Sequence, residues 1–115
     1  MFMKIKYFSK RSLLLIYEMV GMIMNGGGTI YVGMSETGIV YGIDNANLLT
    51  REIAHTVLNL VPNYHYVIDA YIEPIQGKEV VRIEINVKQS ENALFNQYNV
   101  KNNKNKFIPI NQLIG

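Results

Sequence analysis

The chain has 115 residues, of which 49% are hydrophobic and 17% are charged, and its formal net charge is +2 at pH 7. This length predicts one domain spanning residues 1–115 with room for one core, and a charge so close to zero does not by itself indicate a nucleic-acid-binding protein. The absence of cysteine excludes disulfides, cysteine–zinc sites and thiol catalysis, so an intracellular, by default cytoplasmic, location is expected.

The first predicted elements are a short strand and an apolar helix. The segment KIKYF, residues 4–8, alternates in the way typical of a strand. A helix is predicted over about residues 10–24, capped by Ser9 or Ser12, because a serine hydroxyl accepts hydrogen bonds from the free amides of a first turn. This helix contains Glu18 and is shorter than the roughly 20 residues of a membrane span. Because it is apolar on nearly every face, it must be buried either by the sheet and another helix or by a second subunit.

Glycine-rich sequence follows this helix. Asn25 and Gly26 are expected to end it, because residues of both types adopt positive φ at little steric cost. Strands are predicted at residues 29–34 and 39–43. The residues between them, SETG, favour a hairpin turn with Gly38 at its last position.

The three consecutive glycines raise the question of a phosphate-binding loop. In a P-loop the glycines lead from a strand into a helix, whereas here they lead from a helix into a strand. The lysine and serine or threonine of that motif are also missing. We interpret Gly26 as a helix C-cap. Gly27 and Gly28 need a further explanation, since one glycine suffices for a cap.

The second half of the chain predicts a helix and a hairpin. The helix covers residues 47–60, with its apolar residues on one face, and Pro62 follows its end. Two alternating strands are predicted at residues 66–75 and 79–87, joined by a two-residue turn at Gly77–Lys78. The expected pairs on the apolar face are Ile72 with Ile83 and Ala70 with Ile85. The opposite face then carries Asp69, Tyr71, Glu73, Arg82, Glu84 and Asn86.

A last short strand at residues 98–102 and the start of a helix at residues 108–115 complete the predicted elements. The order is β-α-β-β-α-β-β-β, and the sheet is apolar on one face. This pattern indicates an α+β fold with a largely antiparallel sheet and two main helices on one face.

The stretch IMNGGGTIYVGMSETGIVYGID, residues 23–44, resembles the signature of the Schlafen AlbA_2 domain, also called the divergent AAA-4 family. In that signature an apolar helix ends in Asn and is followed by Gly-Gly, an apolar strand ending in Gly, a turn, and a strand ending in Gly-Ile or Gly-Cys. The matching residues are Asn25, Gly27, Gly28, Gly33 and Gly42. The stretch YNVKNNKNKFIPINQLIG resembles the end of the family domain, with Lys101 where the family tends to have Arg.

The resemblance implies nucleic-acid binding, and Schlafen proteins include RNA endonucleases whose divalent metal is held by carboxylates. Two of these carboxylates lie in an opening segment of the form Glu, spacer, Glu-Phe-Lys. Aligning MKIKYFS with that segment puts Lys6 at its lysine and Lys4 at its second glutamate, while the earlier glutamate would fall before Met1. The third carboxylate has a candidate in Glu73, with Asp69 as the alternative. Because a metal ion needs several oxygen ligands, Lys4 argues against nuclease activity, and we assign no catalytic residue, metal or cofactor.

Two alternatives stay open. An active metal-dependent ribonuclease would use Glu73, Asp69 and Glu84 with Mg²⁺ or Mn²⁺, although Arg82 opposite Glu73 favours an ion pair on that face. The second alternative is a protein-interaction or dimerisation module without nucleic-acid affinity.

The favoured hypothesis is a non-catalytic module that binds RNA or DNA. Basic residues cluster near both ends of the chain and are candidates for phosphate contacts: Lys4, Lys6, Lys10, Arg11, Lys101, Lys104 and Lys106. Tyr7 and Phe8 lie among the first four, where an exposed ring could stack on a base or a buried ring could enter the core. Because family proteins often place two such lobes side by side, we expect a homodimer or a longer relative as partner, and no membrane.

Overall fold

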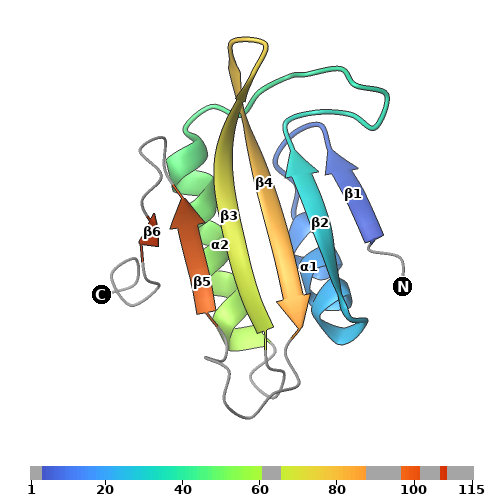
Figure 1. The fold of residues 1–115 in the computed structure, drawn as a ribbon, viewed down its shortest axis with the longest axis vertical. Coiled ribbons are helices and arrows are strands. Elements are labelled where there is room, and N and C mark those ends of the chain that lie inside the picture. The colour runs from blue at the N-terminus through green and yellow to red at the C-terminus, as the bar shows by residue number, and fades with distance from the viewer. Residues whose placement is uncertain (1–3, 61–65, 88–96, 102–106, 109–115) are drawn as a thin grey trace.

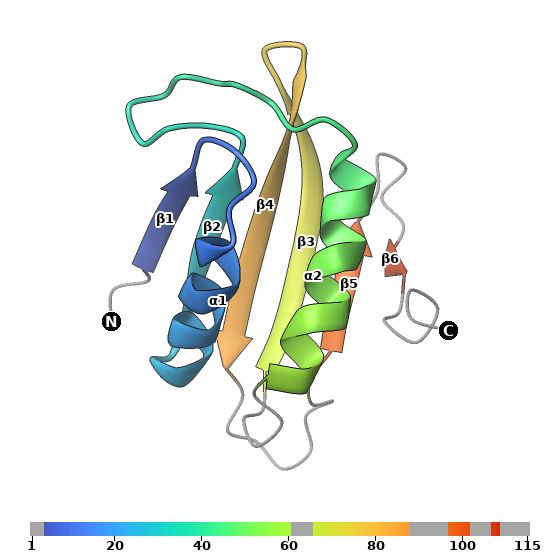
Figure 2. The same cartoon turned by 180° about the vertical axis from the view of Figure 1, so that it is seen from behind.

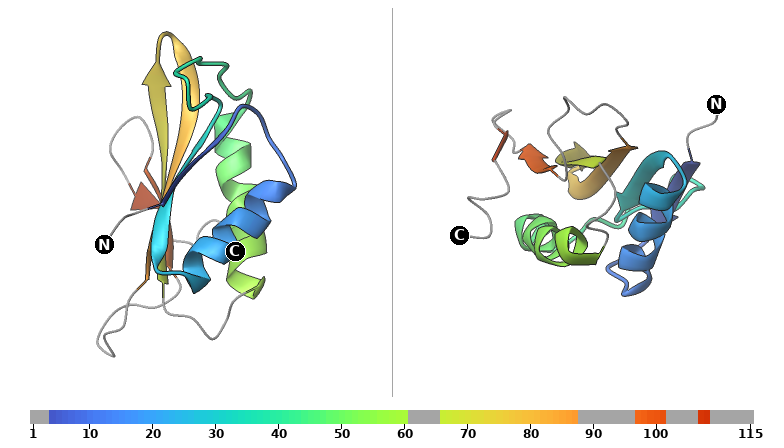
Figure 3. Two further views of the ribbon diagram at one scale, coloured as in Figure 1. Left: turned by 90° about the vertical axis from the view of Figure 1, so that its right-hand side faces the viewer. Right: turned by 90° about the horizontal axis from the view of Figure 1, so that it is seen from below.

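The structure, a computed structural model, describes residues 4–60, 66–87, 97–101 and 107–108. The elements in chain order are β1 (Lys4–Phe8), α1 (Leu14–Met24), β2 (Gly27–Val32), α2 (Ala46–Leu60), β3 (Tyr66–Ile75), β4 (Lys78–Val87), β5 (Gln97–Lys101) and β6 (Phe107–Ile108). The strands form one sheet in the order β1-β2-β4-β3-β5-β6 (Figure 1). Both helices lie on the same face of this sheet (Figures 2 and 3). The predicted α+β class with two helices on one face is therefore confirmed.

The sheet is mixed. β4 pairs antiparallel with β2 and with β3, and β5 pairs antiparallel with β6. The pairs β1–β2 and β3–β5 are parallel. The first parallel pair follows from the connection through α1, because a helix that crosses over between two strands returns the chain in the same direction.

One predicted strand is wrong. Residues 39–43 do not form a strand, and only Val40 makes an isolated bridge. The reason lies in the Gly33 carbonyl, which accepts hydrogen bonds from both Tyr41 N–H (2.7 Å) and Gly42 N–H (2.9 Å). Two successive donors on one acceptor curl the backbone, whereas a strand would use every second residue on each side. The tight turn before this segment does form as predicted, since Gly38 N–H donates to the Ser35 carbonyl (3.0 Å).

The β3–β4 hairpin turns one residue earlier than predicted. Gln76 and Gly77 form the turn, with φ of 53° and 76°, as a type I′ geometry requires. The register therefore shifts by two residues. The observed pairs are Ile72 with Val81, Ala70 with Ile83 and Ile68 with Ile85. Because side chains alternate with a period of two, this shift leaves every residue on its predicted face.

The first helix is shorter than predicted and begins at Leu14. Ser12, one of the two predicted caps, accepts from Leu14 N–H through its Oγ (3.1 Å), and its carbonyl accepts from Leu15 N–H (3.1 Å). At the other end, the Asn25 side chain donates to the Gly21 carbonyl (2.7 Å). The second helix begins one residue before its predicted start and ends where predicted. Of the helical segment predicted at residues 108–115, Ile108 instead belongs to β6, and residues 109–115 lie outside the described residues.

The core lies between the helices and the sheet. Its buried residues from α1 are Leu15, Met19, Met22 and Ile23, and α2 adds Leu49 and Ile53. Ile30, Ile68, Ile83 and Ile85 face them from the strands. Within the described ranges, neither helix has the length and apolarity needed to cross a membrane.

The glycines after α1 are explained by close backbone approach. Gly27 has a φ of 107°, and a Cβ there would overlap the carbonyl oxygen of Ile85 on β4. A Cβ on Gly28 would lie 2.7 Å from Met22 Sδ and 2.8 Å from the Lys4 carbonyl oxygen. Glycine therefore lets β2 pass between its two neighbours and beneath α1.

Candidate nucleic-acid interface

The predicted basic residues that the structure describes lie at the β1 edge of the sheet and on β5. Lys4 and Lys6 lie on β1, and Lys10 and Arg11 lie in the loop between β1 and α1, all exposed. Lys101 lies on β5, which is four strand spacings from β1, or about 19 Å. β1 and β5 are therefore not neighbours in the sheet. Lys104 and Lys106 lie outside the described residues.

Lys4 is held by a carboxylate that sequence analysis did not single out. Its Nζ lies 2.8 Å from Glu18 Oε1 on α1. The Glu18 side chain is 20% exposed and the Lys4 side chain 59%. The position that the resemblance assigns to a metal-binding carboxylate is thus filled by an ammonium group that a glutamate on α1 neutralises. No local sequence pattern signals this pair, because it joins two elements.

Arg11 connects the loop before α1 to the start of α2. Its Nη2 donates to the carbonyls of Asp44 (3.1 Å) and Asn45 (3.2 Å), just before α2, and its Nη1 lies 3.3 Å from Glu52. These bonds tie the loop before α1 to the start of α2. In the part of the chain that the structure describes, Lys6 and Lys10 form no ion pair, so they are the best placed of the four for a phosphate.

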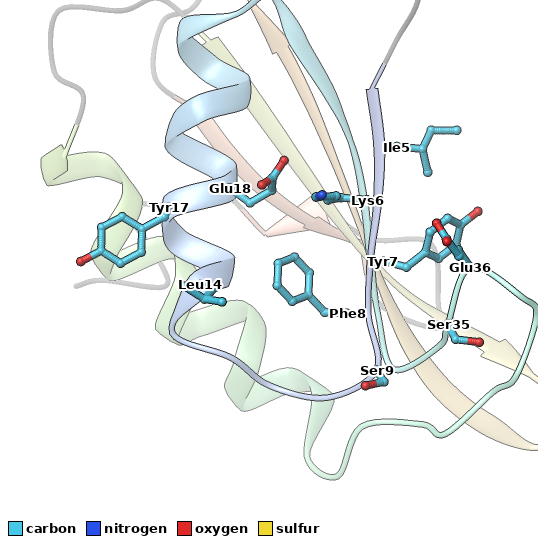
Figure 4. A pocket seen from close by; sticks show the side chains of 10 residues that line it. All are labelled: Ile5, Lys6, Tyr7, Phe8, Ser9, Leu14, Tyr17, Glu18, Ser35 and Glu36. Atoms are coloured by element: carbon cyan, nitrogen blue, oxygen red, sulfur yellow. The ribbon is translucent and has the colours of Figure 1, made fainter.

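The two aromatic residues of β1 point to opposite faces (Figure 4). Phe8 points toward α1 and packs, half-buried, against the core. Tyr7 points to the open face of the sheet, where its ring stacks on Tyr31 with centroids 5.3 Å apart and planes 12° apart. The stacked ring on this strand is therefore Tyr7, and the core ring is Phe8.

The open face carries a row of aromatic and charged side chains across four strands. Tyr7 pairs with Tyr31, Tyr31 with Arg82, and Arg82 with Tyr71. The Arg82 guanidinium lies 5.9 Å from the Tyr31 ring centroid, a cation–π geometry. Sequence analysis did not single out Tyr31. Strand alternation placed Tyr71 and Arg82 on this face, but the pairing of β2 with β4 was needed to bring Tyr31 beside them.

Arg82 also organises the carboxylates of this face. It hydrogen-bonds Glu84, and its Nη1 lies 3.8 Å from Glu73 Oε1, so the predicted ion pair forms diagonally rather than directly opposite. Desolvation is the largest single influence on the pKa of Arg82 and lowers it, but the charge and hydrogen bond of Glu84, together with Tyr31 and Glu73, outweigh desolvation and raise the pKa of the guanidinium. Burial, followed by the charges of Asp69 and Glu84, raises the pKa of Tyr71.

The carboxylates of the ribonuclease alternative share this face. Asp69 pairs directly with Glu84 across the β3–β4 hairpin, and Glu73 lies four residues further along β3. Within the described ranges, no group of three or more His, Cys, Asp or Glu side chains is arranged to hold a metal ion.

A groove lies beside β1 on its outer edge. It has a volume of about 590 Å³ and is lined by β1, by α1 and by the turn after β2. Lys6, Phe8 and Glu18 point into it from β1 and α1, as Figure 4 shows. The exposed Leu14 and Tyr17 form its apolar side on α1.

Comparison with known proteins gives one match. A family model described as Schlafen, AlbA_2 matches residues 3–111, nearly the whole chain. No curated protein and no solved structure matches the chain.

Proposed function

The chain belongs to the Schlafen AlbA_2 family, and on this premise we propose that it is a non-catalytic module that binds RNA or DNA through the phosphate backbone. The family match supports a nucleic-acid-related domain in general. The proposal rests on one observation in particular, the exposed Lys6 and Lys10 without ion-pair partners at the β1 edge of the described structure. Such ammonium groups bind phosphates by releasing condensed counterions.

The non-catalytic part of the proposal is supported by Lys4. A metal-assisted phosphoryl reaction needs oxygen ligands that offset the charge of the ion. The Lys4 ammonium, 2.8 Å from Glu18, instead occupies one position that the resemblance gives to a ligand, and it engages a nearby carboxylate as well.

We test the proposal by titrating transfer RNA, duplex DNA and single strands at several salt concentrations, with and without manganese. If about three phosphates are contacted, log affinity should fall with log salt with a slope of roughly −2 to −3. Lys6→Ala should reduce that slope by about one without changing preference among sequences, because phosphate contacts carry no base information. Lys101→Ala tests the predicted contact on β5, and its effect should add to that of Lys6→Ala, since the two strands are far apart in the sheet.

Arg51→Ala is the matched control, because Arg51 is an exposed cation of α2 outside both clusters. It should leave the slope within error of the original protein. If no nucleic acid binds at low salt, or if Lys6→Ala and Arg51→Ala behave alike, the interaction-module alternative replaces this proposal. Manganese-dependent cleavage of transfer RNA that Glu73→Ala abolishes would instead support the ribonuclease.

We further propose that the module acts as a homodimer through the outer face of α1. Leu13 is 88% exposed and Tyr17 is 73% exposed, and together with Ile16 and Val20 they line a hollow of about 430 Å³. Exposed apolar side chains gathered in this way are typical of protein interfaces. One face of α1 already packs in the core of this chain, so a second copy would cover the outer face of the helix.

Light scattering should accordingly give about twice the chain mass of 13.1 kDa at micromolar concentration. Leu13→Glu should convert the dimer to a monomer without loss of fold, because Leu13 contributes little to the core. Leu48→Glu, at another exposed leucine, should leave the mass unchanged. A monomeric mass for the original protein would remove the dimer from the proposal.

A further inference from the structure

β1 presents an unused hydrogen-bonding edge. It lies at the end of the strand order, and within the described residues its only strand partner is β2. The Phe8 carbonyl faces β2, because it accepts from Gly33 N–H (2.7 Å), and the Lys4 carbonyl also points toward β2 at Gly28. Successive residues of a strand direct their N–H and C=O groups to alternate sides. The backbone groups of Ile5 and Tyr7 therefore point outward, away from the sheet.

A groove with an apolar side runs along this edge. It is the cavity of about 590 Å³ between β1 and α1, and Phe8, Leu14 and Tyr17 contribute its apolar surface. Leu14 is 65% exposed and Tyr17 is 73% exposed, so this apolar surface is open to a partner. An edge strand with free backbone groups next to a helix can bind an extended peptide as an added strand, because the backbone supplies hydrogen bonds and the groove accepts alternate side chains.

We propose that this edge binds an extended, acidic segment of a partner protein by strand addition to β1. The partner backbone pairs with the N–H and C=O groups of Ile5 and Tyr7. On the helix side, an apolar residue of the partner lies against Phe8 and Leu14, and a carboxylate two residues away lies beside Lys6. This site does not depend on the nucleic-acid proposal, although Lys6 belongs to both, so peptide and nucleic acid should exclude each other.

The charge pattern of β1 identifies the occupant. Lys6 is exposed, points into the groove (Figure 4) and forms no ion pair within the described residues. Of the two glutamates that line the groove, Glu18 is neutralised by Lys4, and Glu36 lies beside Tyr7 on the other side of β1 from Lys6. A partner carboxylate would complement Lys6. A second copy of this chain would not complement Lys6. If two β1 strands paired about a two-fold axis, Ile5 of each would lie opposite Tyr7 of the other, and the two Lys6 residues would lie opposite each other. Like charges at such positions oppose pairing, and edge lysines commonly prevent association between identical edges.

The test uses a fluorescein-labelled, end-capped peptide of sequence Thr-Val-Val-Thr-Glu-Val-Thr. It should bind saturably, and amide hydrogen exchange followed by NMR should slow by about tenfold at Ile5 and Tyr7, whose N–H groups become hydrogen-bonded. The Lys6 amide, which faces β2, serves as an internal control and should not change. The same peptide with N-methyl groups at alternate residues should not bind, because it lacks the donors for strand addition.

Charge reversal provides a second, independent readout. Lys6→Glu should weaken peptide binding by about tenfold, and a peptide carrying lysine in place of its glutamate should regain affinity for this variant. Lys10→Glu changes the net charge equally but lies beyond the strand, so it should leave affinity unchanged. The proposal is overturned if the peptide does not bind saturably, if it binds without protecting Ile5 and Tyr7, or if Lys6→Glu and Lys10→Glu have the same effect.

Discussion

Gly27→Ala is expected to lower the free energy of unfolding by roughly 2–5 kcal/mol, which is the sum of positive-φ strain and of backbone displacement. The added methyl group would overlap the Ile85 carbonyl oxygen on β4, and a backbone atom in a paired strand cannot move aside as a flexible side chain can. Urea-induced unfolding monitored by circular dichroism measures the change.

Gly26 offers a matched control for this substitution. Its φ of 98° is close to the 107° of Gly27, but nothing lies within 4 Å of the position that a Cβ would take. Gly26→Ala should therefore show the conformational strain alone, about 1–2 kcal/mol. Equal losses for the two variants would contradict the close-approach explanation. In both variants, nucleic-acid affinity should fall only as the folded fraction falls. If Gly27→Ala instead lost affinity while its stability stayed unchanged, the glycines would have to contact the nucleic acid directly.

Arg82→Gln is expected to destabilise the protein by about 2 kcal/mol at neutral pH, because it removes a hydrogen-bonded charge that is partly shielded from water. Arg82 contacts both Glu73 and Glu84, and its guanidinium lies over the Tyr31 ring. The expected loss is smaller than that for a fully buried pair, since the Arg82 side chain is 36% exposed and water screens its charge. Thermal or urea unfolding measures the loss.

The pH dependence of this loss separates charge repulsion from lost packing. Without Arg82, the carboxylates of Glu73 and Glu84 share the face with Asp69 and repel one another when ionised. The loss should therefore be smaller near pH 3, which lies below the ordinary pKa values of carboxyl groups, so that most of them are protonated. Adding Glu84→Gln should recover part of the stability at neutral pH. An identical loss at both pH values would show that Arg82 acts through packing alone.

The sequence by itself determined the local structure of this protein and the faces of its elements. Alternation predicted the strands β3 and β4, Ser12 was one of the two serines expected at the start of the first helix, and the turn ending at Gly38 was placed where it forms. These predictions succeeded because capping, turn geometry and the alternation of strands depend on residues that are near one another in the chain.

The tertiary structure decided which strands and side chains pair with one another, and these pairs form the candidate site. The parallel partnership of β1 with β2, the Lys4–Glu18 pair and the stacking of Tyr7 on Tyr31 all join residues more than ten positions apart. No local pattern specifies such contacts, because they depend on which strands become neighbours after the core forms. The same holds for the separation of β1 from β5 in the sheet and for the outward edge of β1. Residues 39–43 follow this rule as well. Their composition favours a strand, but the amides of Tyr41 and Gly42 both donate to the Gly33 carbonyl, which is incompatible with strand pairing.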